Sequence, residues 1–566
     1  MAAIGIDLGT TNSLIAFWNQ DGPQLIPNVH GSHLTPSVVS VDETGVIFVG
    51  EIADERRISH PLLTASAFKR HMGTQKKYHL GQYTFSPEEL SSFVLKSLKA
   101  DAEAYLGHEI YEVIISVPAY FNDLQRKATV RAADMAGLAA VRLISEPTAA
   151  AISYGLHQKK SETKFLVLDL GGGTFDVSIL ELFEGIMEVK AVAGDTFLGG
   201  EDFTQVLIAH YIKTNKMNRE EIDTKFMSSI YSQAEKCKRE LTSGEYGVMN
   251  TIHGELEASL VITRADFDEM SQPVIARMRT PIERAMHDAK ISSADLDAII
   301  LVGGATRMPN IRKTAARIFG RLPFTSINPD EAIALGASIQ AALKERDQSL
   351  EELVLTDVCP FSMGTDVARM INNRLEGGFF CPVIERNTSI PVSRREYFHT
   401  IHDYQKNVTF NIYQGESRRV EENLFLGRLS IPVPQNTAGK ECIEVRFTYN
   451  IDGILEVETC VTSTLQTARL VIRNQETNLT DEEINERLRT IRDLKIHPRE
   501  RAENRLLIAR AERIYEECLG EKRNSIADKI YQFESLLELQ DEKKVSEAAA
   551  HFAKMLSDLE GELKNI

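Results

Sequence analysis

The chain carries two similar acidic, glycine-rich phrases, Asp7-Leu8-Gly9-Thr10-Thr11 and, about 160 residues further on, Asp169-Leu170-Gly171-Gly172-Gly173-Thr174. Each phrase follows an apolar run typical of a β-strand, residues 4–6 in one case and residues 165–168 in the other, and each precedes a second such run. We therefore expect each phrase to form the tight turn of a β-hairpin. Glycines in such a turn let backbone N–H groups approach an anion closely.

Two such turns facing each other would hold a nucleotide polyphosphate from both sides. The threonine hydroxyls would add hydrogen-bond donors, and each aspartate is suited to hold Mg²⁺ through water rather than to face phosphate directly. Two ordinary glycine-containing hairpin turns are the alternative. The repetition of the phrase in the same strand context favours phosphate binding.

Length and composition indicate a multidomain globular protein. A chain of 566 residues is too long for one hydrophobic core, so three or four domains are expected, and 43% hydrophobic with 26% charged residues is typical of soluble proteins. The net charge of −17 argues against nucleic acid as a partner.

The same composition indicates a cytoplasmic protein with no membrane partner. No apolar stretch approaches the roughly 20 residues that span a bilayer, and no basic segment precedes the first strand, so a signal peptide is not expected. Six cysteines without a closely spaced pair predict reduced thiols rather than a zinc site or disulfides.

Hydrophobic periodicity divides the chain into regions of different secondary structure. Residues 1–350 alternate helices (86–105, 124–136) with strands (113–117, 299–302), as α/β proteins do. Residues 359–475 alternate apolar and polar side chains at period two, which predicts an antiparallel β-sandwich. Residues 476–566 are helical, and Thr480-Asp481-Glu482-Glu483 is a helix capping box. The apolar run between them, 351–358, is either an ordinary strand or a hydrophobic interdomain linker.

Six ordered motifs make the chain resemble the 70-kilodalton heat-shock chaperone family, the DnaK-like proteins. Besides the two turns, they are Val117-Pro118-Ala119-Tyr120-Phe121-Asn122-Asp123, Glu146-Pro147-Thr148-Ala149-Ala150-Ala151, Leu198-Gly199-Gly200-Glu201-Asp202-Phe203 and Val302-Gly303-Gly304-Ala305-Thr306-Arg307-Met308-Pro309. The resemblance implies an actin-like, two-lobed α/β ATPase (1–350), a linker (351–358), a peptide-binding β-sandwich (359–475) and a shortened helical lid (476–566). The short C-terminus and the substituted sandwich look most like the specialised bacterial HscC branch.

The resemblance also implies an ATP-hydrolysing site with Mg²⁺ and K⁺. Asp7 and Asp169 would hold Mg²⁺ through water, and Asp176 would join them around K⁺. Lys69 would stabilise charge on the transferring phosphoryl group, and Glu146 would orient or deprotonate the attacking water. The expected catalytic residues are Lys69, Glu146, Asp169 and Thr174.

The implied ATP-binding positions come from both phosphate turns and three later segments. They are Gly9, Thr10, Thr11, Asn12, Gly171, Gly172, Gly173, Gly199, Gly200, Glu201, Glu235, Lys238, Arg239, Thr242, Gly303, Gly304, Arg307 and Asp330. By spacing alone, Glu235, Lys238, Arg239 and Thr242 occupy one helix face at i, i+3, i+4 and i+7, which without the resemblance is more typical of a solvated charged face.

Coupling and client positions follow from the same resemblance. Pro118 and Arg126 would relay nucleotide state, Arg142 and Asp357 would meet a J-domain co-chaperone, and Leu353, Val354 and Leu355 would dock on the ATPase with ATP bound. The peptide cleft would be lined by Thr365, Val367, Ala368, Phe398, Ile401, Val408, Phe410 and Ile443. Plain sandwich core is the alternative for these apolar residues, notably for Val408 and Ile443.

Departures from the family pattern predict specialised behaviour. Thr356 replaces a leucine in the docking run, which predicts weaker coupling between ATP binding and peptide release. Phe410 is larger than the usual isoleucine, which predicts a shallower pocket and a narrow client range. The segment between Gly244 and Thr263 is short, which predicts fast nucleotide release and little dependence on an exchange factor.

We therefore expect a monomeric, ATP-dependent chaperone that clamps extended apolar client segments with ADP and releases them with ATP. An actin-like sugar kinase is an alternative from another class, but residues beyond 358 would have no purpose in it. A non-hydrolysing scaffold or exchange factor of the same fold is the second alternative. The joint presence of Lys69, Glu146 and Thr174 argues against it.

Overall fold

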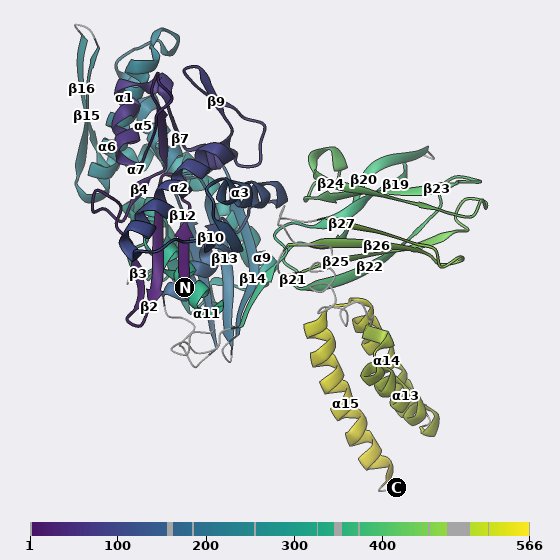
Figure 1. Cartoon of the computed structure of the whole chain (residues 1–566). Coiled ribbons are helices and arrows are strands. Elements are labelled where there is room, and N and C mark those ends of the chain that lie inside the picture. Colours follow the sequence, from purple (N-terminus) through teal and green to yellow (C-terminus); the bar gives the residue numbers. More distant parts are fainter. Residues whose placement is uncertain are drawn as a thin grey trace.

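The computed structural model describes residues 3–154, 162–183, 186–253, 256–324, 327–344, 354–371, 374–450, 453–472, 498–518 and 520–564. Figure 1 shows mixed sheets and helices built from the first 344 residues, a pair of β-sheets beside them, and three C-terminal helices below that pair. Leu353 and the capping box at Thr480 lie outside the described residues.

The first six-stranded sheet begins with the chain itself. β1 (Ala3–Asp7) pairs antiparallel with β2 (Asn12–Asn19) across the first glycine-rich phrase, and parallel with β10 (Glu112–Val117) on its other side. The full order is β11-β10-β1-β2-β3, with β4 also on β2; the additional bounds are β3 Gly22–Leu25, β4 Thr35–Pro36 and β11 Ala139–Ser145. The hairpin predicted around the first phrase is confirmed.

The second six-stranded sheet repeats this arrangement. β12 (Thr163–Leu170) and β13 (Phe175–Phe183) pair antiparallel across the second phrase, with Asp169 opposite Asp176, and β17 (Ala298–Val302) runs parallel to β12. The order is β17-β12-β13-β14-β18-β21, where β14 is Ile186–Asp195, β18 is Val354–Val358 and β21 is Ser389–Ile390. The second predicted hairpin is therefore also present.

Helices cover both sheets because their apolar faces pack against central strands that are buried along most of their length. α11 (Ala332–Lys344) and α4 (Glu146–Ser153) share one hydrophobic core with residues from both sheets. The other helices of this region are α1 (Glu51–Ser59), α2 (Pro87–Leu106), α3 (Asp123–Met135), α5 (Gly200–Thr214), α6 (Thr224–Ser243), α7 (Arg264–Met270), α8 (Gln272–Arg277), α9 (Arg279–Ala289) and α10 (Pro309–Phe319). The expected helices over 86–105 and 124–136 correspond to α2 and α3.

Smaller strands complete the region. β5 (Val38–Val41), β6 (Ile47–Val49) and β7 (Thr64–Ser66) form one sheet, and β8 (Tyr78–Leu80) with β9 (Tyr83–Phe85) and β15 (Tyr246–His253) with β16 (Leu256–Thr263) form two hairpins. No helix within the described ranges is both long and apolar enough to cross a membrane. All six cysteines are free thiols.

Two four-stranded antiparallel sheets form a sandwich after β18. Their orders are β20-β19-β23-β24 and β22-β25-β26-β27, and side chains from both sheets meet in one core. The strands are β19 Met363–Ile371, β20 Arg374–Ile384, β22 Val392–His399, β23 Asn407–Gln414, β24 Leu424–Pro432, β25 Cys442–Tyr449, β26 Leu455–Val461 and β27 Thr467–Ile472. The alternation that predicted a sandwich is thus realised as buried and exposed faces.

The C-terminal helices pack on one another rather than into the sandwich core. α13 (Ala502–Glu517), α14 (Gly520–Glu538) and α15 (Glu542–Lys564) share a hydrophobic cluster that includes the stacked rings of Phe533 and Phe552. The turn between α14 and α15 touches the sandwich, where the Gln540 amide bonds the backbone of Arg395.

Candidate functional site

The two glycine-rich turns meet face to face. A Cβ atom added to Gly172 would lie 1.8 Å from the Thr11 hydroxyl oxygen, and one added to Gly173 would lie 2.7 Å from Thr10 Cγ2. Only residues without a side chain allow this approach. The segment entering α5 packs on the second turn, because Gly200 N–H donates to the carbonyl of Gly171 at 2.9 Å. The geometry brings predicted phosphate-contacting residues of both hairpins to one place.

A buried cluster of carboxylates lies at the base of these turns. Asp7 ends β1, Asp169 and Asp176 face each other on β12 and β13, and Glu146 begins α4; each is 7% exposed or less. Lys69, from a short helix at Phe68–His71, places its ammonium 2.7 Å from Glu146 Oε1. One ammonium thus faces four carboxylates in a dry environment.

The electrostatics of the cluster favour a bound cation. Burial, followed by repulsion from Glu146, raises the pKa of Asp7 to about 7 and that of Asp176 to about 8, and it raises the pKa of Asp169 as well. Burial alone would lower the pKa of Lys69, but attraction to Glu146 and Asp7 outweighs it, so that pKa is raised. These shifts mean that the carboxylates are short of positive charge.

The oxygen chemistry of this cluster fits Mg²⁺ held through its water ligands. Asp169 Oδ2 is buried and has no hydrogen-bond partner in the described part of the chain. Within the same residues, no group of three or more carboxylate, imidazole or thiol side chains is arranged to ligate a metal ion directly. Carboxylates set back from the ion suit Mg²⁺, which gives up its water reluctantly.

The predicted adenosine-contacting residues converge from three elements. On α6, Glu235 accepts from Lys238 at 2.6 Å and from Arg239 at 3.1 Å. Lys238 also donates to the carbonyl of Gly200, which ties α6 to the start of α5. Burial alone would raise the pKa of Glu235, but Lys238 and the hydroxyl of Thr204 lower it to about 2. The Glu235–Lys238 part of this face is therefore constrained, whereas Arg239 keeps 68% of its side chain exposed.

The third element is the short helix at Gly304–Arg307, which directly follows Gly303. Gly303 has φ 83°, and a Cβ atom there would meet the carbonyl oxygen of Leu170 at 2.5 Å. Arg307 pairs with Asp330 at 2.6 Å and keeps 44% of its side chain exposed. Thr242 is directed elsewhere, because its hydroxyl bonds the Lys238 carbonyl one helical turn back.

A short path connects the carboxylate cluster to the sandwich. Ala119 N–H donates to Asp176 at 3.1 Å, and the ring of the next residue, Tyr120, lies 4.3 Å from the ring of Phe361 at the base of the sandwich. Arg126 holds this loop by donating to the carbonyls of Phe121 and Ala119. The loop that includes the predicted relay residue Pro118 thus touches both sites.

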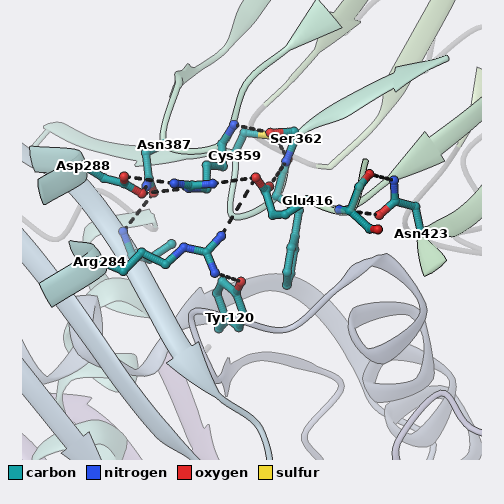
Figure 2. A network of polar contacts seen from close by, with 12 residues as sticks. Tyr120, Arg284, Asp288, Cys359, Ser362, Asn387, Glu416 and Asn423 are labelled. Atoms are coloured by element: carbon teal, nitrogen blue, oxygen red, sulfur yellow. Dashed lines mark hydrogen bonds and ion pairs between the residues drawn. The ribbon is translucent and has the colours of Figure 1, made fainter. Parts of the chain in front are cut away.

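An ion-pair network joins the same two regions (Figure 2). Arg386, between β20 and β21, donates to Asp288 of α9 at 2.7 and 3.0 Å and pairs with Glu416 at 2.6 Å. Asn387 adds a bond of 2.9 Å to Asp288. Burial would raise the pKa of Asp288, but the Arg386 guanidinium lowers it. The Asp288 side chain is 11% exposed and accepts three hydrogen bonds from Arg386 and Asn387, which hold the sandwich against α9.

A second arm of the network passes through Arg284, on the same helix. Its guanidinium donates to the Tyr120 hydroxyl at 3.1 Å and lies 3.9 Å from Glu416 (Figure 2). The sandwich is therefore held to α9 and to the Tyr120 loop by one connected set of charges.

The apolar run before the sandwich continues the second sheet. β18 pairs parallel with β14, Val354 opposite Ile186 and Thr356 opposite Glu188, while Asp357 pairs with Ile390 of β21. The strand and linker alternatives are therefore compatible, because the connecting segment is itself a strand of the sheet, between β14 and β21. Arg142 lies on β11.

The predicted client residues gather between the two sheets of the sandwich. Phe398 and Phe410 pack edge to face at 5.5 Å, and Phe398 lies opposite Ile443 on β25. Phe410 is 3% and Ile443 0% exposed, whereas Ile401 is 45% exposed at the end of the sandwich. The larger ring at position 410 fills space next to Phe398, and Val408 packs against the same core. Of the remaining predicted residues, Thr365 is fully buried, and Val367 and Ala368 are half-buried on β19.

Sequence reasoning missed the residues that join the two regions. No motif contains Asp288, Arg386, Asn387 or Glu416, and each alone is typical of an ordinary polar or charged surface residue. The pair Asp288–Arg386 is separated by 98 residues, so no local pattern could reveal it.

Comparisons with known proteins give a consistent result. The family model described as "Hsp70 protein" matches residues 3–80 and 76–566. "Chaperone protein DnaK" of Thermotoga petrophila is 44% identical over 469 residues, which cover 80% of this chain and 77% of the relative. "Chaperone protein DnaK" of Thermosipho africanus is 40% identical over 497 residues, which cover 85% and 81%.

Proposed function

The chain belongs to the Hsp70 family and is an ATP-dependent chaperone with ATPase activity, and from this premise we propose how its own residues divide the work. The two facing turns bind the phosphates of ATP, the carboxylate cluster binds the metal cation, and the sandwich binds the client polypeptide. The observation that carries the proposal is the contact of Gly172 and Gly173 with Thr11 and Thr10, which makes one anion cradle from two distant hairpins.

For hydrolysis, the assignment rests on charge and burial. Lys69 stabilises charge on the transferring phosphoryl group, and its ion pair with Glu146 keeps it in place until nucleotide enters. Glu146, once separated from Lys69 by the phosphate, is free to orient the attacking water. When bound, Mg²⁺ would neutralise charge on the phosphates; Asp7 and Asp169 would hold it through water, and Asp176 would join them around K⁺.

For nucleotide recognition, the same logic assigns the α6 face and Arg307 to adenosine. The Glu235–Lys238 pair lies beside Gly200, and Arg307, paired with Asp330, keeps 44% of its side chain exposed. The two similar sheets, each with its own hairpin turn, support the actin-like, two-lobed description that the resemblance implies.

For coupling, the strand pairing of β18 with β14 and the Asp288 network carry the proposal. A docked linker and a sandwich held on α9 correspond to the state in which ATP favours client release. Loss of these contacts frees the sandwich to clamp the client. A J-domain co-chaperone is the expected partner near Arg142 and Asp357.

For the client, the packing of Phe410 against Phe398 supports a shallow pocket and a narrow client range. The short β15–β16 hairpin supports little dependence on an exchange factor. We assign the chain to the cytoplasm as a monomer, and its sandwich substitutions to an HscC-like specialisation.

The alternatives are less favoured. A sugar kinase leaves the sandwich and α13–α15 without a role, and a non-hydrolysing scaffold leaves the buried Lys69–Glu146 pair without one.

The test is nucleotide binding and hydrolysis by the full chain and by Lys69→Ala. The variant should bind ATP with Mg²⁺ within about threefold of the parent affinity, yet lose hydrolysis by a factor of 100 or more, consistent with removal of one preorganised charge. Arg279→Ala, a solvent-exposed charge on α9, is the matched control and should leave both unchanged. Equal hydrolysis by Lys69→Ala would refute the assignment.

A further inference from the structure

Three arginines surround one buried aromatic ring in the sandwich. The guanidinium carbons of Arg419, Arg418 and Arg369 lie 4.1, 5.6 and 5.7 Å from the ring centroid of Phe379. Phe379 is 1% exposed, whereas Arg369 and Arg418 are exposed. The ring faces attract the cations, so three like charges are held at one spot.

The arginine cluster, formed by Arg369, Arg418 and Arg419, has fewer carboxylate partners than positive charges among the described residues. Arg419 lies 3.7 Å from Glu376, with both side chains largely exposed. Arg369 and Arg418 have no carboxylate partner within the described residues. The nearby Asp366 is engaged elsewhere, because it accepts from the backbone N–H and the side-chain amide of Asn411. The cluster therefore has a net positive charge.

Strand register places the cluster at the end of the proposed client pocket. Thr365 lies opposite Ile412, and two residues further Val367 lies opposite Phe379. Residues directly opposite each other on neighbouring strands share one face of a sheet, and so do alternate residues along one strand. Val367 and Phe379 therefore lie on the face that carries Ile412. Ile412 and Phe410 belong to the sandwich core where the client residues gather.

We propose that Arg369, Arg418 and Arg419 select clients in which an acidic residue flanks the apolar segment seated in the pocket. The inference rests on the proposed client binding and names the class of segment that this pocket prefers. Charge complementarity supports an acidic occupant, because a basic flank would add a fourth positive charge beside three arginines of which only Arg419 has a carboxylate partner in the described part of the chain. Exposed charge pairs are modest, so the effect is a graded preference and not an absolute requirement.

The test compares labelled peptides that share three central leucines and carry glutamates, lysines or serines on one or both flanks. Affinities are measured by fluorescence anisotropy with the full chain and ADP at low salt. For at least one flank, the peptide with glutamate should bind about tenfold tighter than the peptide with lysine at that flank. This difference in affinity should shrink at about 1 M salt, where charges are screened beyond about 3 Å. The flank that responds would give the orientation of the client.

Two variants localise the effect. Arg369→Ala combined with Arg418→Ala should reduce the glutamate-over-lysine preference to about twofold, with little change for the serine-flanked peptide. Arg428→Ala is the matched control, because Arg428 lies on the same sheet opposite Asn411, on the other face; it should retain the preference.

Equal affinity for all flanks, or a preference that survives the double variant, would overturn this inference while leaving client binding intact. Absence of binding by every peptide would instead contradict the proposed client binding and this inference with it.

Discussion

Replacing Thr356 with valine should strengthen docking of the segment that connects the two regions. Thr356 lies on β18 opposite Glu188 of β14, and its hydroxyl oxygen is buried without a hydrogen-bond partner in the described part of the chain. Valine has nearly the same shape, so the change removes the buried hydroxyl and keeps the packing. It also favours the extended backbone, as β-branched residues do.

The size of the effect follows from the cost of an unsatisfied polar group. Burying a hydroxyl without a partner costs about 1–3 kcal/mol in proteins, and the lower end applies because the residue is half-buried. A gain of about 1 kcal/mol raises the ratio of docked to undocked molecules about fivefold, since about 1.4 kcal/mol corresponds to a factor of ten in an equilibrium constant. Coupling that the sequence predicts to be weak should become stronger.

The assay is stopped-flow release of a labelled peptide after addition of ATP. Thr356→Val should release a larger fraction of peptide, and faster, than the parent chain. Thr356→Ser keeps the hydroxyl and loses the methyl group, so it should release less. Release by Thr356→Val that equals or falls below that of the parent would refute the reasoning.

Three further predictions follow from separate contacts. Asp288→Asn removes the carboxylate that accepts hydrogen bonds from Arg386 and Asn387. ATP-triggered peptide release should therefore slow about tenfold, while ATP hydrolysis without peptide should stay within about twofold of the parent rate. Unchanged release would contradict the role of the network. The pKa of Glu235 is lowered to about 2 from 4.5, so its ionised form stabilises the folded state above about pH 4.5, and this contribution is lost as the pH falls towards 2. Urea unfolding should therefore show Glu235→Gln less stable than the parent at pH 7, by up to about 3 kcal/mol, with the gap narrowing at pH 3; a constant gap would count against the ion pair. Phe410→Ile should open space beside Phe398 and raise the affinity for peptides with a bulky central residue at least fivefold. A peptide array that shows the same preferences for the variant and the parent would contradict the shallow pocket.

The fold was predictable where the sequence pattern is local. Each glycine-rich phrase sits between two apolar runs, so strand, turn and strand are encoded within about 20 residues, and both hairpins form as expected. The sandwich strands were predictable for the same reason, because period-two alternation at residues 408–413 and 443–449 matches one buried and one solvated face.

The contacts between regions could not be predicted in this way. The Arg386–Asp288 pair joins residues 98 positions apart, and nothing near either residue distinguishes it from a surface charge. The ring contact between Tyr120 and Phe361 likewise depends on how the sandwich meets α9. For the carboxylate cluster, the sequence supplied the candidates, while burial and the Lys69–Glu146 contact supplied their electrostatics.

The decisive experiment is steady-state ATP hydrolysis by the full chain, with and without an apolar peptide and a J-domain protein, in parallel with Lys69→Ala. Slow hydrolysis that rises several-fold with either addition and disappears in the variant is the expected result, because we propose that the nucleotide site and the sandwich communicate through the Tyr120 loop and the Asp288 network. Hydrolysis that neither peptide nor J-domain protein alters would contradict that communication.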